Sequence, residues 1–362
     1  MKIKNIFFAA ILVLAGFSCS MEDDAIMNDV ERVIEEATEA YTVLDFGVAF
    51  NEMATKASTT VVPGEDRPAT GDENNDEKKI SEVSVFLLED GKVIGILIPQ
   101  NMNQVSSNSD GSITLKDLKF VTKYKTNRTL EAHVVINGNQ FLKNINIGDA
   151  QSALNQQISG CLSADQLIKY GSTRIVFGKD ITNSYPSPSV AENNPTTILV
   201  KVSHVAARLD FSQFDVTLKG FEGNPTVVFD EAKFVNLQQN GKIVEGDASV
   251  NVKDGAFLNR SNRIGTRWTD LGTAYGYANQ YRQDSEMNTA LYVKFTVDGR
   301  TFEKTYPINP AGITKEVDHN GIKGGYLYDI KVRWTITPDW GDSTIEFYTR
   351  DWVHNSIPEI VL

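Results

Sequence analysis

Four histidines are the residues best suited to metal binding or proton transfer, because imidazole binds metals and titrates near neutral pH. They are widely separated, and none belongs to an H-E-x-x-H pattern or a comparable zinc spacing. They are His133, His204, His319 and His354. The sequence also has no G-x-S-x-G motif, no P-loop and no strand-linked G-x-G-x-x-G motif. These patterns therefore predict no catalytic residue, no metal site and no cofactor.

One short run has the spacing of calcium ligands. Ser106, Asn108 and Asp110 precede Gly111, and Asp117 stands where the last ligand would fall. The same Asn-Ser-Asp-Gly run is an ordinary turn between two strands, and we favour that interpretation. Acidic residues number 47, so a spatial pair of glycosidase carboxylates stays an open alternative that no spacing can identify.

Aromatic residues near the C-terminus could form a platform on which sugar rings stack. They are Trp334, Trp340, Trp352, Tyr326, Tyr328 and Tyr348. Alternating aromatics are also typical of strands that fill the core of a β-sandwich, and that interpretation is favoured here.

Cys19 is a candidate for covalent lipid attachment. Lys2 and Lys4 precede an unbroken apolar run over residues 6–14, and Gly16-Phe17-Ser18 leads directly to the cysteine. This order is typical of an export signal, and the apolar run is too short to cross a bilayer as a helix. We predict that residues 1–19 are a lipoprotein signal and that Cys19 becomes the acylated first residue. An ordinary secretory signal with an incidental cysteine is the alternative.

Composition fits an exported globular protein that does not bind nucleic acid. The chain has 362 residues, which is enough for about two domains, and 41% of them are hydrophobic. Its formal net charge of -12 provides no basic patch for phosphates. With Cys19 acylated only Cys161 remains, so no intrachain disulfide can form.

The N-terminal region changes its apolar period twice. Apolar residues recur at three- and four-residue intervals over residues 22–40, which predicts a helix. Residues 43–50 then alternate, which predicts a strand with one apolar face. That face consists of Leu44, Phe46, Val48 and Phe50. Residues 58–79 are a polar linker rich in proline and glycine, so the strand must pair with a segment further downstream.

From residue 80 onward the sequence predicts short β-strands. Asp90-Gly91 and Asp298-Gly299 predict two tight hairpins. Residues 148–170 are the main segment expected to be helical, and prolines break the chain near residues 184–196. The predicted fold class is all-β, with two tandem β-sandwich domains at 57–194 and 195–362. A signal at 1–19 and a helical propeptide with the detached strand at 20–56 precede them.

Several motifs occur in an order that resembles one known family. Thr55-Lys56-Ala57 is similar to a Thr-Arg-Ala cleavage site, with lysine replacing the arginine. The strand over 198–209 is similar to one that opens a second domain, and residues 306–308 and 328–332 are similar to closing strands. Together with the lipoprotein signal and the detached strand, this order resembles the fimbrillin family, the stalk subunits of type V pili on Bacteroides-type bacteria.

The resemblance implies transthyretin-like sandwich domains and assembly by donor-strand exchange. A trypsin-like protease would cut between Lys56 and Ala57 and release the detached strand together with the lipid that holds the precursor in the outer membrane. The C-terminal segment of the next subunit would then fill the vacated groove. The residues of this chain expected in that donor segment are Ile345, Phe347, Ile357, Ile360 and Leu362.

The implied product is an adhesive fimbria on the cell surface. The implied partners are copies of the chain and other fimbrial subunits joined head to tail, the protease, and a host glycan or protein. No enzymatic activity is implied. The alternatives are a tip adhesin or anchor of the same fimbria, or a glycan-binding surface lipoprotein.

Overall fold

The structure, a computed structural model, describes residues 39–50, 75–108, 112–244, 246–259, 263–309, 319–339, 341–351 and 359–360. In these residues α-helix is limited to two short segments, α3 (Asn139–Leu142) and α4 (Pro188–Glu192). Four 3-10 turns are η1 (Asn75–Lys78), η2 (Met102–Gln104), η3 (Gln151–Leu154) and η4 (Ala164–Gln166). The rest of the regular structure is β-strand, which confirms the all-β prediction. The helix expected over residues 22–40 lies outside the described residues, except for its last two positions, which are not helical.

The first sheet contains eight strands. In spatial order they are β4 (Lys92–Leu97), β3 (Val83–Glu89), β7 (Thr129–Ile136), β9 (Lys169–Val176), β10 (Thr196–His204), β1 (Tyr41–Phe50), β6 (Ile113–Lys123) and β5 (Val105–Ser107). Strand β10 pairs with β1 through residues 196–202 but with β9 only at Ser203 and His204. The sheet therefore folds over along β10, and apolar residues from both of its parts enclose one core.

Strand β3 is buried on both faces. Val83, Val85 and Leu87 contribute to the core inside the first sheet, whereas Phe86 and Leu88 belong to a second cluster on the outer face. Segments from 142–168 and residues from the C-terminal half complete this second cluster. It therefore joins the two halves of the molecule by apolar contacts.

The helix expected within residues 148–170 is wrong. The segment contains η3, the short strand β8 (Gln157–Ser159) and η4. Gly148, Gly160 and Cys161 have positive φ values, which interrupt a right-handed helix. Leu154 and Ile158 are instead buried against the outer face of β3, so tertiary packing and not helical periodicity explains their spacing.

Two further sheets form the C-terminal part. One contains β18 (Arg267–Gly276), β11 (Ala207–Leu218), β21 (Tyr326–Ile336) and β22 (Gly341–Asp351). The other contains β16 (Phe257–Asn259), β12 (Val227–Val235), β19 (Ala290–Val297) and β20 (Arg300–Pro307), with β17 (Arg263–Ile264) also paired to β12. Their shared core is rich in aromatic rings, and Phe214 lies 5.1 Å from Phe229 and 5.3 Å from Trp268 between ring centroids.

Burial decides the role of the C-terminal aromatics that the structure describes. Trp334 is 6% exposed and packs edge-on against Phe295, and Tyr328 is fully buried. The core interpretation is therefore confirmed for these two residues. Trp340, Trp352 and the side chain of Tyr348 lie outside the described part of the chain.

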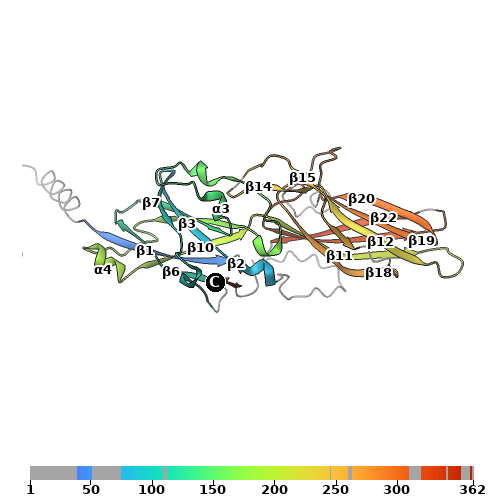
Figure 1. The fold of residues 1–362 in the computed structure, drawn as a ribbon, viewed down its shortest axis with the longest axis horizontal. Helices are drawn as coiled ribbons and strands as arrows, with labels where there is room; N and C mark the ends of the chain where they lie inside the picture. The colour runs from blue at the N-terminus through green and yellow to red at the C-terminus, as the bar shows by residue number, and fades with distance from the viewer. Residues whose placement is uncertain are drawn as a thin grey trace, which may run out of the picture.

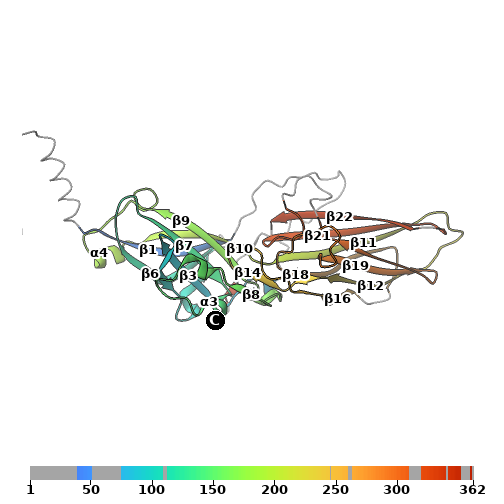
Figure 2. The ribbon, with the colours of Figure 1, turned by 90° about the horizontal axis from the view of Figure 1, so that it is seen from above.

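The sheets lie in two groups along the long axis of the molecule, the eight-stranded sheet at one end and the other two large sheets at the opposite end (Figures 1 and 2). The expected domain boundary between residues 194 and 195 stays a proposal. Strand pairing favours a later boundary, because β10 belongs to the first sheet and β11 to the second group. The proline-rich break before it forms α4, which lies beside β1 and β6.

Short ladders and hairpins complete the fold. The two-stranded ladders are β13 (Leu237–Gln238) with β15 (Val252–Lys253), β14 (Asn240–Lys242) with β8, and β2 (Lys79–Ile80) with β23 (Glu359–Ile360). Both expected Asp-Gly hairpins are confirmed, since Glu89 pairs with Lys92 and Val297 with Arg300. The Asp and Gly of each turn have positive φ, as a two-residue hairpin turn requires.

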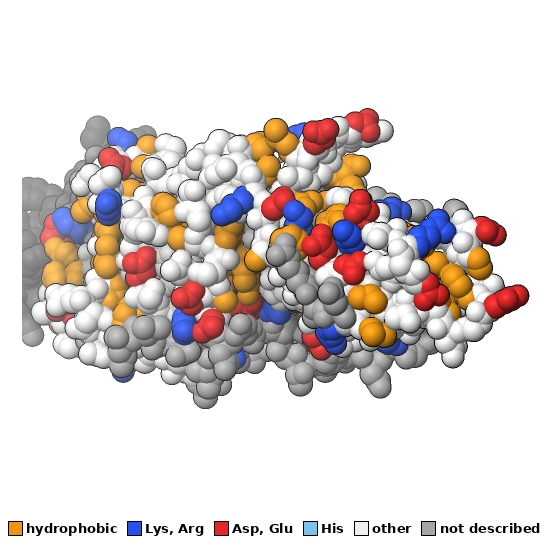
Figure 3. All heavy atoms as spheres, turned by 45° about the vertical axis from the view of Figure 1, so that its right-hand side comes forward, with side chains coloured by type: hydrophobic (Ala, Val, Ile, Leu, Met, Phe, Trp, Pro, Cys, Tyr) orange, Lys and Arg blue, Asp and Glu red, His pale blue; other side chains and the backbone are white. Residues whose placement is uncertain are grey.

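On the surface, acidic and basic side chains are interspersed with apolar ones over the face that Figure 3 shows. Among the described residues no helix is long and apolar enough to cross a membrane.

Candidate functional site: the buried strand β1

Strand β1 presents one continuous apolar face to the core of the first sheet. Leu44, Phe46 and Val48 are 0% exposed and Phe50 is 6% exposed. Their two-residue spacing places them on one side of the strand, and all four belong to the core cluster enclosed by the first sheet. Sequence alternation alone identified this face.

Both edges of β1 are paired along most of its length. Leu44 to Phe50 pair in parallel with Thr196 to Val202 of β10. On the other side β1 pairs antiparallel with β6, in one block from Tyr41 to Leu44 and a second from Phe46 to Val48. The strand therefore lies inside the sheet, although residues 51–74, which connect it to the next described element, are outside the described structure.

Polar contacts hold the beginning of β1. Tyr41 and Tyr185 exchange two backbone hydrogen bonds of 2.8 Å, and the Tyr124 amide donates to the Ala40 carbonyl at 2.7 Å. Lys123 forms an ion pair with Glu39, and this contact lowers the pKa of the Glu39 carboxyl. Because this group of side chains is exposed, we expect the buried apolar face to supply most of the stability of β1.

The C-terminal strand occupies the edge of its own sheet. In the backbone pairing of β22 with β21, Ile345 lies opposite Val332 and Phe347 lies opposite Ile330. Further on, Glu359 and Ile360 of β23 pair in parallel with Lys79 and Ile80 of β2.

The remaining predicted site residues belong to the lipid attachment site, the cleavage site and the end of the donor segment. Cys19, Lys56, Ala57, Ile357 and Leu362 are outside the described residues, so their roles stay predictions.

Among the described residues no group of three or more metal-ligating side chains comes together. His133 is buried, which lowers its pKa, and its ring nitrogens contact Tyr170 Oη at 2.7 Å and Glu131 Oε2 at 3.3 Å.

The last part of the expected linker is folded into the protein. Glu77 of η1 has a fully buried side chain that accepts a hydrogen bond of 2.9 Å from Arg208 Nη1 and another from the Tyr275 hydroxyl. Lys169, also buried, donates to the Glu77 carbonyl at 3.0 Å. The linker prediction is therefore wrong for residues 75–79. Acidic composition suggested solvent exposure, but the partners of Glu77 are more than 90 positions away.

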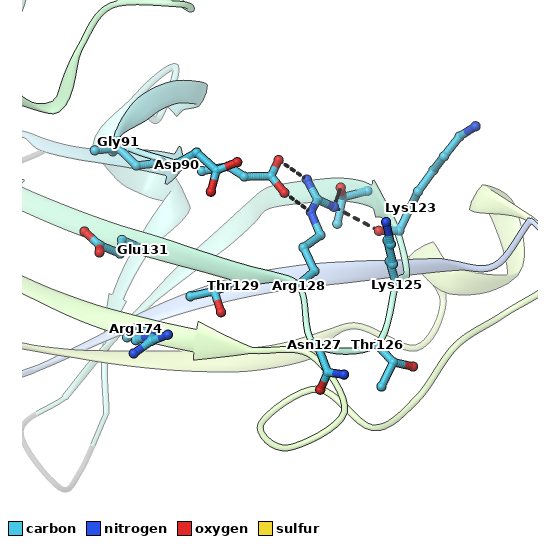
Figure 4. Close-up of a pocket in the computed structure, with 13 residues that line it drawn as sticks. Asp90, Gly91, Lys123, Lys125, Thr126, Asn127, Arg128, Thr129, Glu131 and Arg174 are labelled. Carbon is cyan, nitrogen blue, oxygen red and sulfur yellow. Dashed lines mark hydrogen bonds and ion pairs between the residues drawn. The ribbon is translucent and has the colours of Figure 1, made fainter.

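A polar hollow with a volume of about 950 Å3 is lined in part by Thr122 and Lys123 of β6, which pair with the first residues of β1 (Figure 4). Arg128 crosses one side of it and donates to both carboxylate oxygens of Glu89, at 2.6 and 2.8 Å. Its third nitrogen donates to the Thr122 hydroxyl at 2.6 Å and to the Lys123 carbonyl at 2.9 Å. The Arg128 contacts therefore connect the β3–β4 hairpin to the strand that pairs with β1.

This ion pair predicts a specific pH dependence of stability. Hydrogen bonding by Arg128 lowers the pKa of Glu89 below its ordinary value of 4.5. Such a carboxyl stabilises the fold above its unfolded-state pKa, and the contribution is lost as pH falls through the lower folded-state pKa. Between neutral pH and about pH 3, we expect the wild type to lose about 1 kcal/mol more free energy of unfolding than Glu89→Gln.

Urea unfolding of both proteins at the two pH values measures this difference. Asp90→Asn is the matched control, because it removes a neighbouring carboxyl without changing the Arg128 contacts. Equal losses in wild type and Glu89→Gln would contradict the prediction.

Comparisons with known proteins identify the fold. No family model matches the sequence, and no curated protein matches it. Among solved structures, a candidate cell adhesion protein from Parabacteroides distasonis is 17% identical with a TM-score of 0.58, and the match covers 86% of this chain and 98% of that one. A fimbrilin from Porphyromonas gingivalis is 14% identical, with coverages of 86% and 98% and a TM-score of 0.47.

The fold assignment rests on the first of these two structures, whose TM-score exceeds 0.5. The chain has the same overall fold as that candidate adhesion protein. The likeness to that candidate cell adhesion protein is thus established at the level of the fold.

Proposed function

We propose that this chain is a structural pilin subunit of the fimbrillin type that polymerises by donor-strand exchange. Strand β1 is the observation that carries the proposal. It is a buried strand inside the first sheet, and it precedes the segment that contains the expected cleavage site. Its loss would leave unpaired backbone groups on β6 and β10 above an exposed apolar surface, hereafter the β1 groove, which favours entry of another strand.

Refilling the β1 groove would give a large gross stabilisation. Four apolar side chains occupy it in β1, and burying each contributes about 1.5–3 kcal/mol before the costs of association. The proposed donor is the C-terminal segment of a neighbouring subunit. In this chain, the residues of that segment include Ile345, Phe347, Ile357, Ile360 and Leu362. Because donor and acceptor surfaces differ, this contact propagates head to tail into a filament. No catalytic residue is needed.

The proposed maturation starts from an exported lipoprotein. Cys19 would carry the lipid that holds the precursor in the outer membrane, and a trypsin-like protease would cut after Lys56 to place Ala57 at the new N-terminus. Arg67, Lys78 and Lys79 are rival sites, but cutting there would remove more of the linker. Lys78 and Lys79 are also poorer targets because they lie in η1 and β2 within the folded protein. The mature subunit would lie in the fimbria at the cell surface, where a host glycan or protein is the proposed adhesion partner.

Changing Lys56→Gln is expected to block maturation, because the protease loses the cation that its specificity pocket binds. N-terminal sequencing of material sheared from cells measures the result. Wild-type polymer should begin at Ala57, whereas the variant should remain a full-length acylated precursor with little polymer. Lys78→Gln is the matched control and should mature normally. Normal maturation of Lys56→Gln would exclude this cleavage site.

A terminal subunit of the same fimbria, either tip or anchor, is the second candidate. The observation that favours it is the pairing of Glu359 and Ile360 with β2 of the same chain, because a tail bound to its own subunit cannot enter a neighbour. Incorporation at one end of the filament only, seen by immunogold labelling, would support this alternative.

A further inference from the structure

Gly47 is buried although it lies on the face of β1 opposite the apolar core residues. Its φ is not positive, so the backbone conformation does not require glycine. The limited space around this position favours it. A Cβ atom at this position would lie 3.1 Å from Leu199 Cδ1 and 3.2 Å from the Ile113 carbonyl oxygen. Glycine inside a strand commonly marks such a close approach.

The two neighbours of Gly47 come from the strands on either side. Leu199 is the partner of Gly47 in the parallel pairing with β10, and its side chain is 51% exposed, so it can move. Ile113 contributes a backbone atom of β6, which cannot move without disturbing the pairing of β6 with β1. The β1 groove is therefore narrow on its outer face at the Gly47 position.

The pairing of β1 with β6 is interrupted just before this point. Leu44 lies opposite Phe120, but Phe46 lies opposite Leu115, so residues 116–119 form a bulge facing Asp45. A strand displaced by two residues would place a paired position against this bulge. A displacement by one residue would turn its apolar face outward. The groove thus accepts one register.

We infer that the Gly47 position and the bulge facing Asp45 select which strand can enter the β1 groove, an inference that rests on the strand exchange proposed above. The selected partner is an extended segment of another subunit that runs in the direction of β1. It carries large apolar side chains at alternate positions and glycine or a similarly small residue between the second and third of them.

The C-terminal strand of this chain does not meet the last requirement. Suppose that residues 341–351 enter the groove in the direction of β1 with Ile345 and Phe347 at two neighbouring inward positions. These two residues can then replace three different pairs among the four apolar residues of β1. The three replacements place Tyr348, Glu346 or Thr344 at the Gly47 position. Each brings a Cβ atom into the narrow region. A donor strand with a small residue at this position should therefore enter the β1 groove more readily than residues 341–351 of a second copy of this chain.

The crowding around position 47 is tested by thermal unfolding of the intact chain. Gly47→Val should lower the melting temperature, and adding Leu199→Ala should restore part of the loss because the flexible neighbour is removed. Ala49→Val is the matched control, since Ala49 is a half-buried residue on the same face of β1. Equal effects of Gly47→Val and Ala49→Val, without rescue by Leu199→Ala, would overturn the inference.

Selectivity is tested by strand exchange in the full chain, cut at a protease site inserted within residues 57–74. Fluorescent peptides of residues 39–50 compete with the bound β1, and anisotropy measures their entry. The Gly47→Val peptide should bind about tenfold more weakly than the wild-type peptide, and the Ala49→Val peptide should bind like wild type. A peptide of residues 341–351 should bind more tightly after Glu346→Gly and Tyr348→Gly.

The outcomes separate this inference from the proposed function. If the wild-type peptide never enters, strand exchange itself is wrong, and the inference fails with it. If wild-type and Gly47→Val peptides enter equally, strand exchange stands and the selectivity inference alone is overturned.

Discussion

Replacing Phe46 by aspartate should lower the free energy of unfolding of the full-length precursor by about 4 kcal/mol or more. Phe46 is 0% exposed in the core of the first sheet, so the change removes a buried ring and places a carboxylate among apolar side chains. A domain of ordinary stability has about 5–15 kcal/mol in total, so the effect is large.

Thermal and urea unfolding of the precursor measure this effect. Ala49→Asp is the matched control, because it adds the same charge to the same strand at a half-buried position on the opposite face. We expect a much smaller loss there. An unchanged melting temperature for Phe46→Asp would show that β1 does not contribute to the stability of the first sheet.

Removal of residues 357–362 should abolish filament formation while leaving a folded, processed monomer. Strand β22 pairs with β21 through residues 341–351, and that ladder is untouched by the deletion. Within the part of the tail that the structure describes, only the short β23 ladder is lost. The proposed acceptor groove, in contrast, loses the apolar end of its donor.

Electron microscopy of filaments, together with thermal unfolding of the truncated protein, measures both effects. Glu359→Gln is the matched control, because it changes the same segment but keeps its apolar residues and its length. Filaments formed by the truncated chain would remove the donor role from this tail. A large fall in melting temperature would indicate instead that the tail serves its own subunit.

Local patterns in the sequence determined the elements whose causes are local. The Asp90-Gly91 and Asp298-Gly299 turns form as predicted, because both residues of a two-residue hairpin must adopt positive φ and these types do so at low cost. The apolar face of β1 follows from two-residue alternation, and the four residues predicted for it are all buried. The all-β class follows from many such short runs.

Tertiary structure alone decided which strands pair and which residues approach across long sequence separations. β1 pairs with β10, some 150 positions away, and Glu77 meets Arg208 and Tyr275, although composition placed residue 77 in a linker. Residues 148–170 follow the outer face of β3 instead of forming a helix, because that face offers apolar burial. Gly47 is crowded only after β6 and β10 flank it. Alternation determines which face of a strand is buried, but its neighbours depend on how all the faces pack together, and that information is not local.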